Sequence, residues 1–339
     1  MRLTIFTSTG YGSGIAHHLA SEGHAVSVVT GVQVGSASVD TLSSTDIAFF
    51  DSNTFYPLAE MAREHGARVI GPTSWSNLLS IDSNYRTNLI KAIGYSECPV
   101  GEKGIEAHVA LLFNGNRFIA RTLNFNYTKM MAGDVGCDLE STGYITLFKI
   151  ENSKLVNDIS APLERFLRKA NHRGFFLIHT LSNQKGVFVK DISSNFCAPF
   201  TQAIYENTRR MRADVVLDVF NESSQPLSFV DPLVIGAMIS VYPYPAQAPS
   251  LRTPVVGLNP YNMKHMWLVD ATGSGNNWSC GQLSGCLGYV IARGISMEEV
   301  RRRLYRTISN LSISNIQYRN DLGKDINEKL YQLKELKLI

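Results

Sequence analysis

Short apolar runs alternate with amphipathic stretches over the first 75 residues of the chain. The four predicted strands are Leu3–Phe6, Ala25–Thr30, Asp46–Phe50 and Arg68–Gly71, and the two predicted helices are Ile15–Glu22 and Pro57–His65. Strands separated by helices indicate parallel βαβ units. We therefore expect a Rossmann-like domain over residues 1–75.

The pattern becomes helical over Trp75–Gly94, which predicts a linker helix within residues 76–103. From residue 104 onward two hairpins are expected. In the first, Asn114-Gly115 separates two β runs, and an Asn-Gly pair in that position is a strong hairpin signal. The predicted hairpin strands are Ala107–Phe113 with Arg117–Leu123 and Phe175–Leu181 with Gly186–Ile192, and between the hairpins lie a strand at Tyr144–Ile150 and a helix at Leu163–Ala170. Residues 104–235 therefore read as an α+β domain with an antiparallel sheet.

The last part of the chain, residues 236–339, is expected to form a small C-terminal lobe. Residues 243–263 are rich in Pro, Gly, Ser and Asn and are predicted as a loop. A strand at Tyr289–Ala292 precedes helices at Met297–Leu311 and Ile326–Leu336. The predicted fold class is α/β, with a Rossmann-like parallel sheet followed by an α+β lobe and this C-terminal lobe.

Composition narrows the protein class without pointing to a function. Of 339 residues, 44% are apolar and only 18% are charged, which suffices for a large core and argues against disorder. No apolar run approaches the roughly 18 residues of a membrane span, and the N-terminus does not resemble a signal peptide, so we expect a cytoplasmic protein without a membrane partner. The five cysteines are scattered without a CxxC pair, so neither a disulfide framework nor a metal site is expected.

A glycine-rich loop follows the first predicted strand and leads into a helix. Its candidate ligand-binding residues are Ser8, Thr9, Gly10, Tyr11, Gly12, Ser13 and Gly14. Glycines allow close backbone approach, and free N–H groups at a helix start favour an anion such as phosphate. The second strand ends in Thr30-Gly31 rather than an acid, which weighs against a dinucleotide. The alternative is a tight turn with a purely structural purpose.

Polar residues at two later positions form further candidates. The loop Gly133-Asp134-Val135-Gly136 precedes Asp138 and Glu140, and these acids could position an amine or a metal, unless the loop is simply solvated. At the end of a predicted strand, Asp191 and Ser193 share a face because side chains alternate along a strand. With Asn195 they could hold a small polar ligand, although a single carboxylate is a poor Mg²⁺ site.

Arginine and lysine residues gather in three clusters. The residues we assign to a phosphate-backbone partner are Arg165, Arg168, Lys169, Arg173, Arg209, Arg210, Arg301 and Arg302. The planar arginine side chain suits phosphate, and double-stranded DNA is the partner these clusters suggest. Solvated helix faces look similar, so that interpretation also stays open.

In this order, the motifs resemble glycinamide ribonucleotide synthetase (phosphoribosylamine–glycine ligase), a family of the ATP-grasp superfamily. The chain's matching segments are Gly71-Pro72-Thr73, Gly104-Ile105-Glu106-Ala107, Gly133-Asp134-Val135-Gly136, the stretch Val189–Ile204, the stretch Gly236–Pro243, and Tyr318–Gly323. The resemblance covers most of the chain, and each motif alone is degenerate. It implies an ATP-grasp-like fold and glycine as a ligand.

The departures from the family pattern concern ATP. In the family a long ATP-clamping subdomain separates the linker helix from the GEEAS strand, whereas here Cys98-Pro99-Val100 leads almost directly to Gly104. The family's metal-binding Glu and Asn correspond to Asp191 and Ser193, and its substrate Arg corresponds to Asn195. The resemblance therefore implies a truncated ATP-grasp-like lobe, and we expect no ATP, metal or other cofactor.

Without ATP, joining an amino acid to an acceptor requires an acceptor that is already activated. We therefore expect an ATP-independent transferase in which the amine of glycine or another small amino acid displaces phosphate. By analogy with bacteriophage amino-acid:DNA transferases, the expected acceptor is a 5-phosphomethyl uracil in double-stranded DNA, flipped out of the helix and stacked on Tyr11. The expected catalytic residues are Asp134 or Glu106 as the base and His17 at the leaving phosphate.

Two other functions stay open at this point. One is a true ATP-dependent phosphoribosylamine–glycine ligase with a reduced ATP site, which would need ATP and Mg²⁺. The other is a non-catalytic relative that binds a phosphorylated metabolite or DNA. The sequence leaves the amino acid, the acceptor and the oligomeric state open.

Overall fold

The N-terminal residues form the parallel βαβ domain that the hydrophobic pattern predicts. The computed structural model describes residues 1–30, 44–150, 152–194, 199–249, 251–275, 277–281 and 283–339. The N-terminal elements are β1 (Arg2–Thr7), α1 (Gly12–Ser21), β2 (Ala25–Thr30), β3 (Ile47–Phe50), the 3-10 helix η1 (Asn53–Phe55), α3 (Tyr56–Glu64) and β4 (Arg68–Ile70). The four strands run parallel in the order β2-β1-β3-β4.

The linker consists of two helices, where the pattern predicts one. α4 (Ser74–Ile81) ends at Asp82, and α5 (Ser83–Ala92) starts there. The Asp82 carboxylate accepts a hydrogen bond of 3.0 Å from the backbone N–H of Tyr85, so this side chain caps the second helix and fixes the break. The linker also supplies β5 (Ser96–Glu97), which pairs in parallel with β10 of the large sheet.

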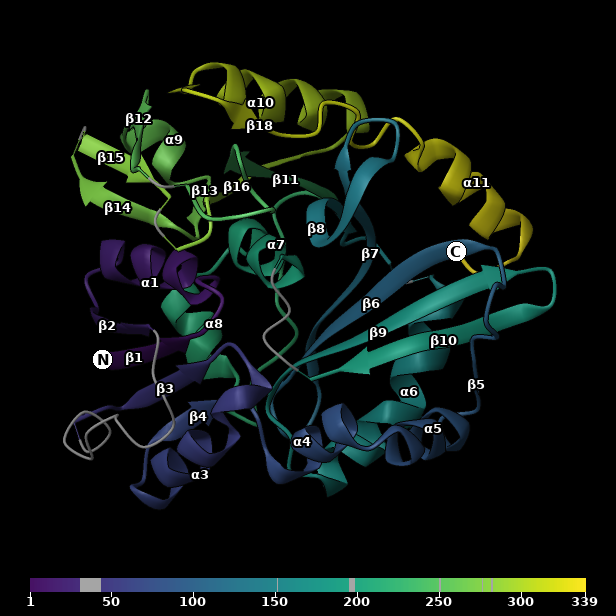
Figure 1. The fold of residues 1–339 in the computed structure, drawn as a ribbon. Coiled ribbons are helices and arrows are strands. Elements are labelled where there is room, and N and C mark those ends of the chain that lie inside the picture. The colour runs from purple at the N-terminus through teal and green to yellow at the C-terminus, as the bar shows by residue number, and fades with distance from the viewer. Residues whose placement is uncertain (31–43, 151, 195–198, 250, 276, 282) are drawn as a thin grey trace.

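A ten-stranded sheet forms the centre of the molecule (Figure 1). Its strands are β5, β6 (Ile105–Phe113), β7 (Phe118–Met131), β8 (Val135–Leu147), β9 (Gly174–Asn183), β10 (Gly186–Ser193), β11 (Leu233–Val241), β13 (Met266–Leu268), β16 (Cys286–Gly294) and β18 (Ile316–Gln317). The order is β13-β16-β11-β8-β7-β6-β9-β10-β5, with β18 beside β11. Both predicted hairpins form, and the boundary expected between residues 235 and 236 falls inside β11.

Helices cover the large sheet on both faces. They are α6 (Lys154–Lys169), α7 (Phe200–Asn207), α8 (Arg212–Asp218), α10 (Met297–Ser309) and α11 (Ile326–Glu335). Along β6, Val109 and Leu111 face the core that includes α6, while Ala110 and Leu112 face the core shared with the N-terminal domain. The sheet therefore connects two cores, one on each face.

The segment 243–263, predicted as a loop, contains regular structure. It holds β12 (Thr253–Val256) and α9 (Pro260–Met263), and β12 joins a third sheet in the order β14-β15-β12-β17, with β14 (Ala271–Ser274), β15 (Asn277–Cys280) and β17 (Ser312–Ile313). The hydrophobic pattern does not predict β12 because the strand contains Pro254, and proline is rare inside sheets. Within the described residues, no helix combines the length and apolar character that crossing a membrane requires.

Candidate functional site

A cavity of about 680 Å³ opens between the end of the large sheet, the β7–β8 hairpin and α11. It is lined by side chains from β6, β7, β8, β9 and α11. The charged and histidine residues of the lining are Glu106, His108, Lys129, Asp134, Glu140, His179 and Lys329. Two of the three predicted catalytic residues, Glu106 and Asp134, thus line one cavity.

Glu106 is held between two cationic or ionisable partners. Its Oε2 lies 2.8 Å from His179 Nε2, and its Oε1 lies 2.6 Å from Lys190 Nζ. The hydrogen bond from His179, together with the contacts of Lys190, lowers the pKa of Glu106 to about 2 even though partial burial opposes this. A carboxylate with so low a pKa is a weak proton acceptor, so Glu106 is better suited to orient His179 than to act as the base.

His179 and His108 form a stacked pair that the sequence reasoning did not single out. The register of β6 and β9 places them directly opposite each other, and their ring centroids are 4.1 Å apart. His108 is buried beside Phe200, and this burial is the main reason why its pKa lies well below the ordinary histidine value. Polar residues at alternate positions of the otherwise apolar run IEAHVALLF were the signal that could have identified His108.

The Glu106 hydrogen bond defines the proton arrangement of His179. A carboxylate only accepts hydrogen bonds, so Nε2 of His179 carries the proton and Nδ1 of a neutral ring is left as an acceptor. This carboxylate–histidine dyad is an arrangement that lets a histidine take a proton from a nucleophile and stabilises the resulting cation. This pairing makes His179 the candidate general base of the cavity.

Asp134 is engaged by a buried arginine. It occupies the tip of the β7–β8 hairpin with φ +56°, and its Oδ1 accepts a hydrogen bond of 2.7 Å from Arg319 Nη1. Arg319, only 2% exposed, also binds Asp321 through Nε and Nη2 at 2.8 and 2.7 Å. The backbone N–H of Gly133 donates to Asp321 at 2.8 Å. These contacts fix the hairpin tip at the cavity and leave Asp134 as a charged member of its wall.

Glu140 connects the cavity with the glycine-rich loop. Glu140 is exposed, but desolvation by nearby protein atoms, together with the negative charge of Asp51, raises its pKa. Glu140 in turn contributes to the raised pKa of Tyr11, whose main cause is burial. The Tyr11 ring packs against Tyr289 with centroids 6.2 Å apart, and its stacking on a flipped base stays a prediction.

The donors of the glycine-rich loop bind an internal carboxylate. Asp51 accepts hydrogen bonds from the backbone N–H of Ser8 at 3.0 Å, from Thr9 Oγ1 at 2.9 Å and from Thr7 Oγ1. The N–H of Gly10 is bonded to Thr7 Oγ1 at 2.8 Å. A phosphate at this loop would have to displace the nearly buried Asp51, so the geometry favours the structural alternative for Ser8 and Thr9.

The glycines of the loop allow close packing on the large sheet. A Cβ at Gly10, where φ is +85°, would lie 2.9 Å from the carbonyl oxygen of Val269. A Cβ at Gly14 would lie 3.2 Å from the carbonyl oxygen of Leu268, and one at Gly12 would lie 2.6 Å from Ile5 Cγ2. Gly10 and Gly14 thus let α1 approach the end of β13, and Ser13 continues this first turn through its N–H bond to Gly10.

His17 lies outside the cavity. Its ring packs edge-on against Trp278 of β15, with centroids 5.9 Å apart, and burial lowers its pKa. The neighbouring His18 is buried, with Nε2 3.1 Å from the carbonyl oxygen of Met266. The structure therefore does not bring His17 together with Glu106 and Asp134.

Asp191 and Ser193 line a separate, smaller cavity of about 180 Å³ with Arg86 of α5. Asp191 Oδ1 lies 3.8 Å from Arg86 Nε, and Asp191 stands opposite His179 in the β9–β10 register. Asn195 falls outside the described residues. Within the described ranges, no three His, Cys, Asp or Glu side chains converge as metal ligands.

Several of the predicted DNA-binding residues make internal contacts. Arg173 pairs with Glu222 and Arg210 with Asp218, while Arg168 binds Glu164 and Arg301 donates to the carbonyl oxygen of Leu322. Arg209 donates to the carbonyl oxygen of Phe229. Four of these residues are exposed and have no ion pair to any described residue. They are Arg165 and Lys169 on α6, Arg302 on α10, and Arg209.

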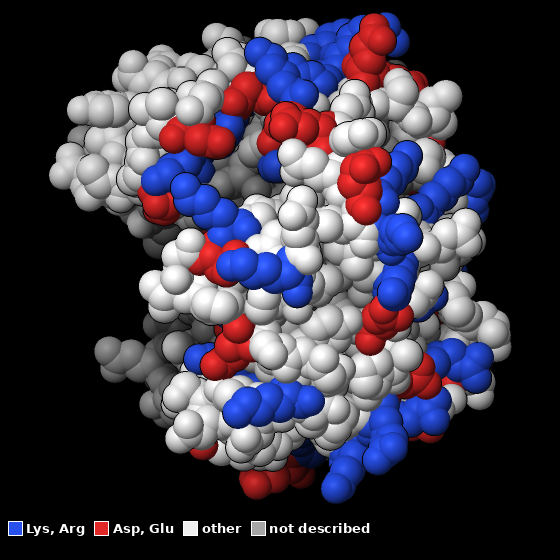
Figure 2. All heavy atoms as spheres, turned by 90° about the vertical axis from the view of Figure 1, so that its right-hand side faces the viewer, with Lys and Arg blue, Asp and Glu red and all other residues white. Residues whose placement is uncertain are grey.

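These exposed cations lie on elements that are far apart in the fold, with α10 at one edge and α6 behind the large sheet (Figure 1). On the face that carries α11 and the β9–β10 hairpin, Lys and Arg are interspersed with Asp and Glu (Figure 2). The view shows no continuous basic stripe on this face. Double-stranded DNA stays a predicted partner.

Comparison with solved structures identifies the fold. A phosphoribosylamine–glycine ligase from Thermotoga maritima superposes with a TM-score of 0.75 at 15% identity, covering 95% of this chain and 100% of that one. The biotin carboxylase domain of the Hydrogenobacter thermophilus 2-oxoglutarate carboxylase gives 0.66 at 10% identity, covering 98% and 97%. A phosphoribosylglycinamide synthetase from Anaerococcus prevotii gives 0.61 at 10% identity, covering 92% and 98%.

The chain has an ATP-grasp-like fold. It has a parallel N-terminal sheet and a larger mixed sheet, and it superposes over nearly its whole length on ligase and carboxylase structures, which confirms the predicted fold class. No protein-family model matches the sequence, and no curated protein sequence is similar to it. At identities of 10–15% the structural similarity shows the fold alone, and the chemistry of this chain depends on the residues of its cavity.

Proposed function

We propose that this ATP-grasp-like chain is an enzyme that transfers a small amino acid to a phospho-activated acceptor, by forming a bond from the amine nitrogen to the carbon that phosphate leaves. The observation that carries this proposal is the cavity with the Glu106–His179 dyad, whose wall combines acids with Lys129 and Lys329. A cavity wall with both negative and positive side chains suits an amino acid, because this zwitterion presents an ammonium and a carboxylate.

The proposed step uses the dyad to prepare the nucleophile. His179 Nδ1 takes a proton from the ammonium of the amino acid, and Glu106 stabilises the imidazolium that forms. The neutral nitrogen then forms a bond to the acceptor carbon, while the carbon–oxygen bond breaks and phosphate leaves with the electron pair. No oxidant, reductant or nucleotide is consumed.

The proposal also holds that the reaction does not use ATP. The connection from β5 to β6 consists only of residues 98–104, at the place where the resembling family carries its ATP-clamping subdomain. An ATP-dependent ligase is the second candidate function, and the likeness to a phosphoribosylamine–glycine ligase favours it. Under that alternative the cavity would hold the same amino acid, and ATP would activate the acceptor.

The test incubates the purified chain with labelled glycine and DNA containing 5-phosphomethyluracil, with and without ATP and Mg²⁺. A parallel arm replaces the DNA with a free phosphomethyl-uracil nucleoside. We expect labelled product and released phosphate without ATP, in the DNA arm or in the nucleoside arm. Strict dependence on ATP would replace the proposal by the ligase, and absence of product in all arms would leave a binding protein.

Two variants connect this result with the cavity. His179→Asn removes the proposed base and should lower the rate by about 100-fold or more. His65→Asn is the matched control, because His65 is exposed on the N-terminal domain, and it should keep the rate. Equal rates in both variants would exclude His179 as the base.

A further inference from the structure

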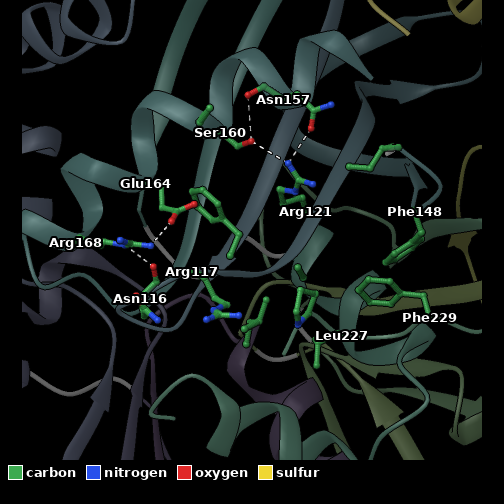
Figure 3. Close-up of a pocket in the computed structure, with 16 residues that line it drawn as sticks. Asn116, Arg117, Arg121, Phe148, Asn157, Ser160, Glu164, Arg168, Leu227 and Phe229 are labelled. Atoms are coloured by element: carbon green, nitrogen blue, oxygen red, sulfur yellow. Dashed lines mark hydrogen bonds and ion pairs between the residues drawn. The ribbon is translucent and has the colours of Figure 1, made fainter. Parts of the chain in front are cut away.

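A second cavity lies at the opposite end of β7, between this strand, α6 and the segment around Leu227 (Figure 3). Its volume is about 660 Å³, within the range of small-molecule sites. Arg121 lines this cavity, whereas Tyr127 and Lys129 of the same strand line the cavity of the dyad. At roughly 3.3 Å per residue the two sites are about 25 Å apart, so they are distinct.

The cavity contains positive charge that its own walls do not neutralise. Arg117, Arg121 and Arg168 line it together with one acid, Glu164, which pairs with Arg168. Arg117 and Arg121 form no ion pair with any residue in the described part of the chain. A cation held partly away from water without a counter-charge is costly, so the pair favours an anion from outside.

Arg121 is held in position by neutral groups. Its Nη1 donates to Asn157 Oδ1 at 2.9 Å and to Ser160 Oγ at 3.2 Å, and both partners belong to α6. These two bonds orient the guanidinium, and since Nε and Nη2 donate to no described residue, their N–H groups are available to a ligand. Guanidinium donors arranged as a fork match the two oxygens of a carboxylate or phosphate.

The other wall of the cavity is apolar. The rings of Phe148 and Phe229 pack with centroids 4.4 Å apart and an angle of 49°, and Leu227 lies beside them. Figure 3 shows this aromatic pair on one side of Arg121 and the Arg168–Glu164 pair on the other. The site therefore presents cations and an apolar surface to the same ligand.

We propose that this cavity binds a small organic anion in which a phosphate or carboxylate group is attached to an apolar, ring-sized body. The oxyanion lies between Arg117 and Arg121, and the body packs against Phe229 and Leu227. This site is separate from the proposed transferase chemistry and would exist whether or not that proposal holds.

The experiment measures binding to the full chain by calorimetry, with four probes: phenyl phosphate, phenylacetate, inorganic phosphate and benzyl alcohol. We expect the first two to bind and the last two to bind at least tenfold more weakly, because each lacks one half of the ligand. The stronger of phenyl phosphate and phenylacetate identifies the oxyanion. Equal binding of inorganic phosphate, or no binding of either organic anion at millimolar concentration, would overturn the proposal.

Variants locate the binding. Arg121→Met should weaken phenyl phosphate at least tenfold, and Lys154→Met should leave it unchanged, because it removes one positive charge from the exposed start of the same helix. If Arg121→Met fails to fold, Arg117→Met tests the other arginine of the pair, which lies just before β7. Phe229→Ala should weaken phenyl phosphate and leave inorganic phosphate unaffected. Retained affinity in both arginine variants would contradict the assignment.

Discussion

At the scale of single residues, the cavity depends on how neighbours change proton affinity. Glu106 is kept ionised by His179 and Lys190, whereas burial keeps the adjacent His108 neutral. Glu140, at the other end of the cavity, is shifted in the opposite direction by desolvation and by Asp51. Three titratable groups on one surface thus have three different electrostatic environments, which is common where proton transfer occurs.

The low pKa of Glu106 predicts a measurable pH dependence of stability. Its folded value of about 2 lies below the ordinary 4.5, so the ionised form stabilises the fold above pH 4.5. This contribution is lost as the pH falls from about 4.5 to 2, and it is on the order of 1 kcal/mol after allowance for a half-exposed side chain. We expect Glu106→Gln to flatten the decline of the free energy of unfolding in this range.

Urea unfolding at several pH values between 7 and 3 provides the measurement. The control is Glu64→Gln, which changes an exposed glutamate at the end of α3. It should follow the pH dependence of the unmodified chain. Parallel curves for Glu106→Gln and the unmodified chain would show that His179 and Lys190 do not stabilise this carboxylate.

The sequence identified part of this cavity, for reasons that differ between residues. Glu106 and Asp134 were found because they sit in motifs that resemble a known family. His179 was missed because its importance comes from the β6–β9 register, which places it opposite His108 and beside Glu106. Such cross-strand pairs depend on strand pairing, which a linear pattern does not specify.

At the scale of elements, the contacts of the glycine-rich loop favour a structural role, the packing of α1 against the end of β13, over ligand binding. The N–H of Ser8 and the hydroxyl of Thr9 are bonded to Asp51, and Gly10 and Gly14 lie against the end of β13. The sequence pattern of strand, glycines and helix fits phosphate binding equally well. Close packing on a sheet and close approach to a phosphate both require glycines, which have no side chain. Only the position of Asp51, which comes from the next strand of the sheet, distinguishes them.

Gly10 and Gly66 have nearly the same backbone conformation, so substituting each in turn separates the cost of a steric clash from the cost of backbone strain. Gly10 has φ +85° and a close neighbour at Val269, while Gly66 has φ +83° and no atom within 4 Å of the place that a methyl group would occupy. We expect Gly66→Ala to cost about 1 kcal/mol from backbone strain alone. Gly10→Ala should cost about 1–3 kcal/mol more, because the methyl group would also collide with the sheet.

Urea unfolding at neutral pH measures both variants. Their difference, rather than either value, reports the contact between α1 and β13. Equal destabilisation by the two substitutions would mean that the loop does not need to approach the sheet closely. In that case the glycines would again be available to a ligand, and phosphate binding should be tested directly.

At the scale of the whole molecule, distant segments meet at Arg319. This buried side chain binds the tip of the β7–β8 hairpin through Asp134 and its own segment through Asp321, and its guanidinium lies 5.0 Å from the Tyr127 ring centroid. The motif resemblance found both segments, 133–136 and 318–323, without indicating that they touch. Their contact links the C-terminal residues to a wall of the cavity.

Replacing Arg319 should loosen this wall. Arg319→Met leaves Asp321, whose side chain is 17% exposed, without its bidentate partner, and this should cost about 1–3 kcal/mol. We expect faster hydrogen exchange at the backbone N–H of Gly133, which donates to Asp321. Arg302→Met, an exposed change on α10, is the control. Unchanged exchange at Gly133 would show that the hairpin holds its position without the arginine.

The continuity of the large sheet predicts that the segments on both sides of residue 235 unfold cooperatively. β11 pairs with β8 on one side and with β16 on the other, so residues on both sides of position 235 belong to one sheet. A lobe consisting of residues 104–235 would lose most of β11 and expose the edge of β8, an unfavourable state for a long apolar strand. We therefore expect residues 104–339 to unfold in a single calorimetric transition, and limited proteolysis of the full chain to yield no stable fragment ending near residue 235. A protected fragment with that end would mean that the two sides of β11 are held together more weakly than the continuous hydrogen bonding of the sheet implies.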